Sequence, residues 1–220
     1  MILNVIVPVK SFSEAKSRLA EILTLSQRIE LSRSLLQNTI KVLQEVTIPI
    51  RNLVVSRDPE AITMADKAGF FSINENRHSN LNSAIRLAAS VPELDYSTGV
   101  LILPADLPLI THTDIEGIIN ESSESPVVVI VPDRWKKGTN CLLVNPADLI
   151  PFSFGDRSFI QHKHLARAAG VKIKVIQNAH MAIDLDTPED LKFILDQDTS
   201  KSKFHQFLEQ FITEKRGEYV

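Results

Sequence analysis

Cations and hydroxyls gather near the start of the chain, within the stretch PVKSFSEAKSRL. Lys10, Lys16 and Arg18 stand directly after an apolar run, with Ser17 among them. Such a cluster suits a triphosphate, because phosphate oxygens bind most strongly to charged donors. The stretch contains no glycine, so it is neither a Walker motif nor a dinucleotide fingerprint, and any grip on phosphate must come from side chains. A solvated surface loop is the structural alternative.

Aspartates stand at the ends of two further stretches. Asp106 leaves the apolar run Val100–Leu103 between two prolines, which hold it in one direction. Asp184 and Asp186 alternate along an extended segment and therefore point to the same side. Hard divalent cations take carboxylate oxygens, so either residue could join Asp106 around a metal ion. The alternatives are a turn cap at Asp106 and a helix cap at Asp186 or Thr187.

Two polar stretches in the second half of the chain could receive a small anion. Gly155 and Ser158 stand where a helix begins, and the N–H groups of a helix start are free to bind anions. Thr139 lies between Gly138 and Asn140, where the chain re-enters an apolar strand, so its hydroxyl could face the same cleft. A carboxylate is the guest that we expect at Ser158, and a plain helix cap is the alternative.

The histidines and the cysteine favour no metal site. His162 and His164 are two residues apart, and on a helix they point about 200° away from one another, which makes a poor chelate. Cys141, the only cysteine, stands in an apolar run and is expected in the core. A single cysteine allows no internal disulfide, which suits a reducing cytoplasm.

The elements that position these residues alternate along the chain, which predicts a three-layer α/β fold with a mostly parallel sheet. Ligands in such folds bind beyond the carboxyl ends of the strands. Short apolar runs predict strands over Ile2–Val9, Leu53–Val55, Val100–Leu103 and Val127–Val131. Periodicity and capping residues predict helices over Ser26–Val46, from Pro59 to a stop at Gly69 with Asp58 as cap, over Asn82–Ser90, Thr113–Asn120 and Ser158–Ala169, and from Thr187.

Composition narrows the partners and the location. The 220-residue chain has a net charge of −3, whereas a dedicated nucleic-acid binder is usually basic. No apolar run approaches the roughly 20 residues that span a bilayer. The first residues predict a strand rather than a signal peptide. We therefore expect a cytoplasmic protein without a nucleic-acid or membrane partner.

The end of the chain differs from the rest. We expect one main domain over residues 1–195 and a helical tail over residues 196–220, beginning at a polar break. The tail carries an apolar stripe at helical spacing. This stripe must be covered, either by the body of the same molecule or by a second copy, and a homodimer is the prediction. The stripe consists of Phe204, Phe207, Leu208 and Phe211.

Taken in order, the motifs resemble the 2-phospho-L-lactate / phosphoenolpyruvate guanylyltransferases of deazaflavin coenzyme factor 420 biosynthesis. The resemblance implies a three-layer α/β/α nucleotidyltransferase fold, Rossmann-like and of the nucleotide-diphospho-sugar transferase type. DTPEDL alone is common to many nucleotidyltransferases, and the combination of AKSRL, ADLPL, GTN and SFxxH is much more specific. The motifs are PVKSFSEAKSRL, Leu81-Asn82, PADLPL, VPDR with GTN, FGDRSF followed by His162, and DLDTPEDL, and they span residues 8–191.

The resemblance also implies a reaction and its residues. GMP would pass from GTP to the phosphorylated three-carbon acid, with release of pyrophosphate and with Mg²⁺ as cofactor. Family members often have glycine before Leu81, where this chain has Asn80, a residue that tolerates a left-handed backbone. Lys16, Arg18 and Asp106 would act in catalysis. By motif, Lys16, Ser17 and Arg18 would contact the GTP phosphates, with Lys10 nearby, and Leu81 and Asn82 would contact the guanine and ribose. Asp106 and Asp186 would bind the magnesium ions. Thr139, Gly155 and Ser158 would bind the carboxylate end of the acceptor.

Several alternatives stay open at this point. A related nucleotidyltransferase could use 3-phosphoglycerate, a sugar phosphate or the molybdenum cofactor as acceptor, although the glycine-rich start of such enzymes is absent here. A glycosyltransferase would commonly show two alternating aspartates after the central strand, where this chain has Ala105, Asp106 and Leu107. A regulatory nucleotide-binding module is the non-enzymatic alternative. The choice among 2-phospho-L-lactate, phosphoenolpyruvate and 3-phosphoglycerate depends on the shape of the pocket.

Overall fold

A seven-stranded sheet forms the centre of the molecule in the computed structural model, which describes residues 2–75, 80–91 and 99–197. The strand order is β3-β2-β1-β4-β6-β5-β7. Only β6 runs against its neighbours β4 and β5, and the other described pairs are parallel, so the prediction of a mostly parallel sheet is confirmed. The strands are β1 Leu3–Val9, β2 Ile50–Ser56, β3 Phe71–Asn74, β4 Val100–Ile102, β5 Val127–Pro132, β6 Thr139–Asn145 and β7 Lys172–Val175.

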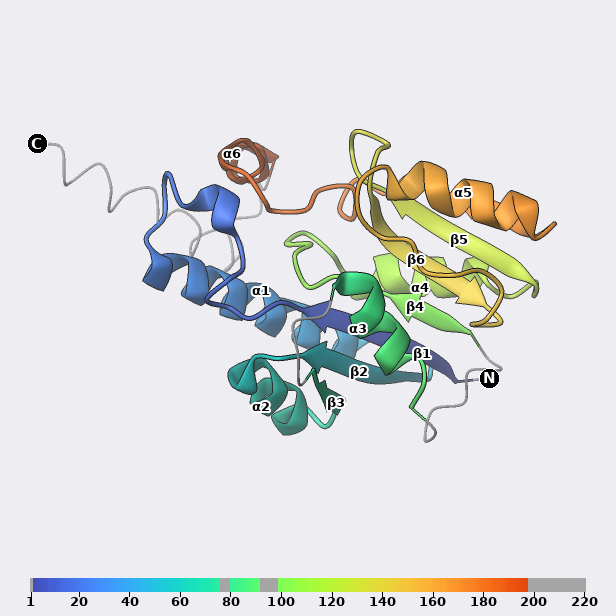
Figure 1. Cartoon of the computed structure of the whole chain (residues 1–220), viewed down its shortest axis with the longest axis horizontal. Helices are drawn as coiled ribbons and strands as arrows, with labels where there is room; N and C mark the ends of the chain where they lie inside the picture. The colour runs from blue at the N-terminus through green and yellow to red at the C-terminus, as the bar shows by residue number, and fades with distance from the viewer. Residues whose placement is uncertain (1, 76–79, 92–98, 198–220) are drawn as a thin grey trace, which may run out of the picture.

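Helices cover both faces of this sheet (Figure 1). Successive residues of a strand point to opposite faces, so Val5 and Ile6 of β1 enter different layers of the core. One layer packs beneath α1, α2 and α4, and the other beneath α3 and α5, which makes the three-layer fold that the sequence predicts. The helices are α1 Leu25–Glu45, α2 Pro59–Lys67, α3 Leu81–Ala88, α4 His112–Glu121, α5 Ser158–Ala168 and α6 Pro188–Gln197.

The last helix packs away from the sheet. Buried Leu191 and Ile194 of α6 join Leu31 and Leu35 of α1 in a third apolar cluster. Leu19 of the short 3₁₀ helix η1, Ser17–Leu19, belongs to the same cluster. This contact joins α6 to η1 and α1, and it places α6 beside the segment that follows β1. The helix runs through Gln197, slightly past the predicted boundary at residue 195, and the apolar stripe of the tail lies outside the described residues.

The predicted helix starts are mostly confirmed. The Asp58 carboxylate accepts hydrogen bonds from the N–H groups of Glu60 and Ala61 and so caps α2, and Gly69, with a φ of 76°, follows the end of that helix. Asn80 does not use its tolerance of the left-handed region, because its backbone is extended with a φ of −82°. Its side chain instead caps α3 by accepting from Ser83 N.

The sequence allowed Ser158 to be the cap of α5, and the structure shows that it is not. Arg157 occupies the N-cap position with a φ of 53°, and Ser158 is the first helical residue.

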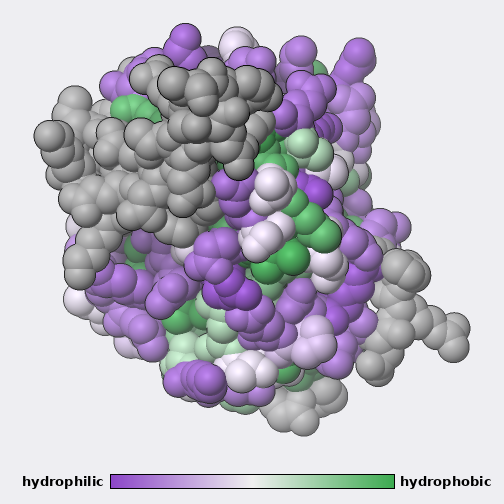
Figure 2. All heavy atoms as spheres, turned by 90° about the vertical axis from the view of Figure 1, so that its left-hand side faces the viewer, coloured by the Kyte–Doolittle hydropathy of each residue, from purple (hydrophilic) through white to green (hydrophobic). Residues whose placement is uncertain are grey.

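Figure 2 shows the side of the molecule that lies on the left in Figure 1, where hydrophilic surface is interrupted by hydrophobic patches. None of the helices in the described ranges has the length and apolarity to cross a membrane.

Candidate active site

A cleft of about 930 Å³ opens at the carboxyl ends of the strands. Its walls come from residues that follow β1 to β5 and from the start of β6, which reaches the same edge because it runs the other way. This is the position that the fold class predicts for a ligand. Ser17 is exposed and is not part of the lining. The other predicted site residues do line it, namely Lys10, Lys16, Arg18, Leu81, Asn82, Asp106, Thr139, Gly155, Ser158 and Asp186.

The Lys16 ammonium lies between two carboxylates. Its Nζ is 3.1 Å from Oδ2 of Asp106 and 2.9 Å from Oδ1 of Asp186. Burial works to lower the pKa of Lys16, but the two carboxylates outweigh it and the pKa is raised above its ordinary value. Burial likewise works to raise the pKa of Asp186, and Lys16 brings it below the usual range. Lys16 and Asp186 are therefore both charged at neutral pH.

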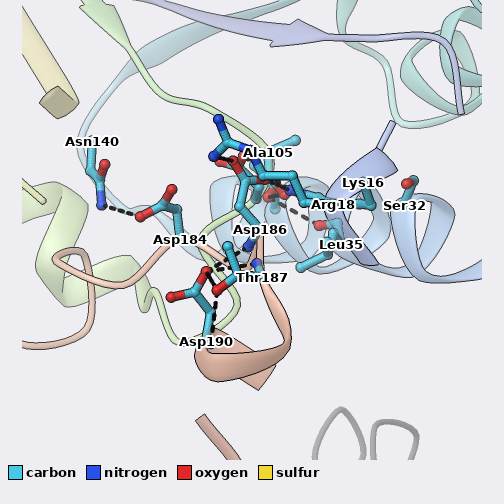
Figure 3. Close-up of polar contacts among 12 residues, drawn as sticks. Lys16, Arg18, Ser32, Leu35, Ala105, Asn140, Asp184, Asp186, Thr187 and Asp190 are labelled. Atoms are coloured by element: carbon cyan, nitrogen blue, oxygen red, sulfur yellow. Dashed lines mark hydrogen bonds and ion pairs between the residues drawn. The ribbon is translucent and has the colours of Figure 1, made fainter. Parts of the chain in front are cut away.

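Asp186 is free to face this cluster because another residue caps the following helix. Asp190 accepts from the N–H groups of Asp186 and Thr187, and the Thr187 hydroxyl accepts from Asp190 N in return. Figure 3 shows Asp190 beside Thr187, and Asp186 turned toward Lys16 and Arg18. Nη1 of Arg18 is 3.9 Å from Oδ2 of Asp186. The cap alternative is thus confirmed at Thr187 and wrong at Asp186.

A third aspartate stands beside the first two. Burial, and then the nearby charges of Asp106 and Asp186, raise the pKa of Asp184 to about 6. Asn140 Nδ2 donates to Asp184 Oδ1 at 3.4 Å and to the Met181 carbonyl at 3.0 Å. This amide holds the strand-like segment against the start of β6. The sequence pattern placed Asp184 and Asp186 on one side but could not rank them.

The carboxylates suit a magnesium ion that arrives with a nucleotide. Within the described ranges, no set of three or more histidine, cysteine and carboxylate side chains is arranged as a metal site. Asp106 and Asp186 nevertheless converge on one cation, Lys16 Nζ, so their oxygens already face a common centre. Magnesium commonly takes one or two carboxylates and completes its shell with phosphates and water. The donor set fits that pattern.

The segment after β1 is held in a fixed shape. The Asp58 carboxylate that caps α2 also accepts from Phe12 N at 2.8 Å and from the Ser11 hydroxyl at 3.1 Å. Lys16 itself has a φ of 54°, in the left-handed region, which costs a residue with a side chain roughly 1–2 kcal/mol. Such strain is typical of functional sites. Cations on the cleft wall are Lys10, Lys16, Arg18, Arg57, Lys137 and Arg157.

The opposite wall is built around the segment before α5. Asn82 grips the backbone of Phe154 with two hydrogen bonds, accepting from Phe154 N at 2.7 Å and donating to Phe154 O at 2.9 Å. His162 contacts this wall as well, since its ring packs edge-on against Phe154 with centroids 4.9 Å apart. The amide of Asn82 therefore joins α3 to the segment that carries Gly155. Leu81 beside it is half-exposed.

Two of the N–H groups at the start of α5, which the sequence predicts to be free, are already bonded. Ser158 N donates to the Gly155 carbonyl at 3.2 Å, and Phe159 N donates to the Lys137 carbonyl at 3.1 Å. Phe159 N is used because the β5–β6 connection lies directly against the helix start. An anion at this wall would therefore meet fewer free N–H groups than the sequence predicts.

Some residues of the motifs act as supports that sequence reasoning did not identify. Asp133 accepts from the N–H groups of Lys137 and Gly138 and shapes the β5–β6 connection. Arg134 forms an ion pair with Asp190 at the start of α6. Their place in the VPDR motif was the available signal, but the pattern did not separate support from contact. His164 is exposed while His162 is buried, so the two rings do not share a site, and Cys141 is buried as predicted.

The fold defines the class of protein. A protein from Desulfovibrio desulfuricans G20 assigned to the nucleotide-diphospho-sugar transferases superposes with a TM-score of 0.75 at 16% identity, covering 99% of this chain and 98% of its own. CMP:2-keto-3-deoxy-manno-octonic acid synthetase in complex with CTP gives a TM-score of 0.59 at 14% identity, with coverages of 88% and 97%. The chain has a nucleotidyltransferase fold of the nucleotide-diphospho-sugar transferase type.

Sequence similarity identifies the family. The phosphoenolpyruvate guanylyltransferase of Rubrobacter xylanophilus is 37% identical over 186 residues, 84% of this chain and 90% of that protein. The 2-phospho-L-lactate guanylyltransferase of Methanothermobacter thermautotrophicus is 32% identical over 192 residues, 86% of this chain and 82% of that protein. Residues 3–217 match the family described as "Guanylyl transferase CofC like", and the chain belongs to it. This membership decides against the glycosyltransferase and regulatory alternatives.

Proposed function

We propose that the protein transfers GMP from GTP to phosphoenolpyruvate or 2-phospho-L-lactate and releases pyrophosphate, in deazaflavin coenzyme factor 420 biosynthesis. The observation that carries the proposal is the charge cluster at the strand ends, where Lys16 lies between Asp106 and Asp186 in a member of a guanylyl transferase family. The names of the relatives supply both acceptors. A related acceptor, such as 3-phosphoglycerate, a sugar phosphate or the molybdenum cofactor, is the alternative.

The reaction needs charge neutralisation more than a general base. The second pKa of a phosphate monoester is about 6, so the acceptor phosphate is largely a dianion at neutral pH and can attack the α-phosphorus of GTP directly. A new P–O bond forms there as the bond to pyrophosphate breaks. Two polyanions must approach one another, and cations that meet the developing charge lower the barrier.

The two walls of the cleft divide the substrates in this proposal. Lys10, Lys16 and Arg18 hold the phosphates of GTP, with Ser17 at the outer end of the same segment. Leu81 and Asn82 lie along the nucleoside. Ser158, Gly155 and Thr139 on the opposite wall hold the carboxylate end of the acceptor. Support comes from the positions of these residues around one cleft, with Ser17 as the exception.

Asp106 and Asp186 are the residues that would hold magnesium. A bound magnesium ion would neutralise charge on the phosphate oxygens that react. Their shared partner, Lys16, is then released toward the phosphates of the nucleotide. There its positive charge would balance the pyrophosphate that leaves.

The experiment is a pyrophosphate-release assay with GTP, magnesium and one acceptor at a time. We expect release with phosphoenolpyruvate or 2-phospho-L-lactate, and a clear preference for GTP over ATP. Mass spectrometry of the product should show GMP joined to the acceptor phosphate. Release only with a sugar phosphate, or equal use of ATP, contradicts the proposal and favours another nucleotidyltransferase reaction.

A further inference from the structure

His162 is a buried histidine with a different partner on each ring nitrogen. Its Nδ1 lies 3.0 Å from the hydroxyl oxygen of Thr139 at the start of β6. Its Nε2 lies 3.0 Å from the backbone nitrogen of Ser153, in the segment that leads to α5. The ring therefore lies between the start of β6 and the segment that leads to α5, and it is fully buried.

The two contacts leave one arrangement of protons on the ring. A backbone N–H can only donate, so Nε2 must accept from Ser153 and carries no hydrogen. Burial lowers the pKa of His162 to about 4, so the ring is neutral at pH 7 and its single hydrogen stands on Nδ1. Nδ1–H then donates to the Thr139 oxygen.

This tautomer decides what the Thr139 hydroxyl presents to the cleft. Because the oxygen accepts from His162, the hydroxyl hydrogen is left to donate elsewhere. In the described part of the chain, that oxygen has no second hydrogen-bond partner, and Thr139 lines the cleft. With the opposite tautomer the hydroxyl would donate to the ring and offer only lone pairs, which would repel an anion.

We propose that His162 is a positioning residue, which orients the Thr139 hydroxyl as a hydrogen-bond donor to the anionic acceptor. The inference rests on the proposed function for the class of acceptor. It also accounts for an anion subsite at a helix start where Ser158 N and Phe159 N are already engaged. His162 itself touches neither substrate and takes no part in proton transfer.

Two variants separate the two ring contacts. In His162→Asn the side-chain amide nitrogen takes the place of Nδ1 and can still donate to Thr139. In His162→Gln the amide oxygen takes the place of Nε2 and can still accept from Ser153 N. We expect His162→Gln to raise the KM of the acceptor about ten- to hundredfold, the effect of one hydrogen bond to a charged group. The KM of GTP should stay near the wild-type value, and His162→Asn should keep most of the acceptor affinity.

The controls distinguish this role from simple packing. His164→Gln makes the same change on an exposed residue of the same helix and should alter neither KM. Thr139→Val should reproduce the loss in His162→Gln, and the double variant should be no worse than Thr139→Val alone, because both remove one interaction. Equal acceptor KM values for His162→Gln and wild type, or additive losses in the double variant, overturn the proposal.

A spectroscopic measurement tests the tautomer without catalysis. In a ¹H–¹⁵N spectrum of the imidazole nitrogens of the whole protein at neutral pH, the His162 proton is expected on Nδ1. A proton on Nε2 overturns the inference whatever the kinetics show. If wild-type protein releases no pyrophosphate with any acceptor, the proposed function fails, and the spectrum still decides the arrangement of the ring.

Discussion

Burial and charge act in opposite directions on Lys16. The Lys16 side chain is only 7% exposed, and such enclosure favours the neutral amine. Asp106 and Asp186 reverse this preference, and Lys16 in turn keeps the partly buried Asp186 ionised. The three groups therefore depend on one another. Removing one carboxylate changes both the charge of the cleft and the position of the lysine.

The first prediction concerns the aspartates. Asp106→Asn should lower turnover by about a hundredfold or more, the scale for losing a strong electrostatic contact in the transition state. Asp186→Asn should act similarly, and excess chelator should abolish the wild-type activity. The measurement is the rate of pyrophosphate release at saturating GTP. Asp148→Asn, on the exposed surface outside the cleft, is the matched control. Near-normal turnover in both variants contradicts the metal assignment.

The second prediction concerns His162 and pH. The unfolded chain takes up a proton on this ring below about pH 6.5, while the folded protein holds it neutral down to about pH 4. The unfolded state therefore binds more protons in this window, and stability falls as the pH is lowered through it. The loss is about 3 kcal/mol for a pKa difference of this size.

Denaturant unfolding of wild type and of His162→Gln, measured between pH 7 and pH 4, checks this. The glutamine variant starts less stable, but its stability should fall less steeply across the window, because it has lost this titrating group. The exposed His164 again supplies the control, and His164→Gln should follow the wild-type curve. Parallel curves for wild type and His162→Gln would show that the buried ring titrates normally.

At the scale of elements, α3 and the segment before α5 behave as one unit. Asn82, at the start of α3, holds both backbone groups of Phe154. The nucleoside wall and the acceptor wall of the proposed site are therefore connected by one amide. A change in either wall is expected to reach the other through this contact.

The third prediction follows from that connection. Asn82→Ala leaves two backbone groups of Phe154 without their partner and should destabilise the fold by about 1–3 kcal/mol. The KM values of GTP and of the acceptor should both rise. Asn80→Ala removes the cap of α3 without removing a bond to Phe154, so it should lower the melting temperature and leave the acceptor KM near wild type. A rise in the GTP value alone would mean that the two walls act independently.

The elements that the sequence predicted are those with a strong local pattern. β1, β2, β4 and β5 are apolar runs, and the helices have capping residues or a clear period, as at Asp58 and Pro188. β3 and β7 were missed because they are short, half-exposed edge strands without an apolar run. The reversal of β6 was invisible, since strand order depends on contacts far apart in sequence.

Within the candidate site, too, local sequence patterns could be predicted and long-range contacts could not. The residue types and the end of the sheet where they meet could be predicted, because several of them, such as Lys10 and Asp106, stand shortly after a strand. The individual partners could not be. That Lys16 lies between Asp106 and Asp186, and that Phe159 N is already bonded to the Lys137 carbonyl, depends on packing between distant segments.

At the scale of the whole molecule, the oligomeric state is expected to depend on the end of the chain. The stripe of Phe204, Phe207, Leu208 and Phe211 has helical spacing and must be covered by protein. The helix before it, α6, packs through one side on α1, while Phe193 on α6 is partly exposed. A second copy of the chain is the partner that we propose for the stripe, and the body of the same molecule is the alternative.

The fourth prediction tests this by mass in solution. Light scattering of the intact chain at micromolar concentration should give a dimer, and a version ending at Gln197 should be a monomer. The shortened chain keeps the third apolar cluster around Leu191 and Ile194, so its fold and its cleft should survive. Replacing Phe207 by serine in the full chain should weaken the dimer without shortening the chain, whereas Phe204→Leu should preserve it. A monomeric intact chain refutes the dimer, and a shortened chain that still dimerises places the interface elsewhere.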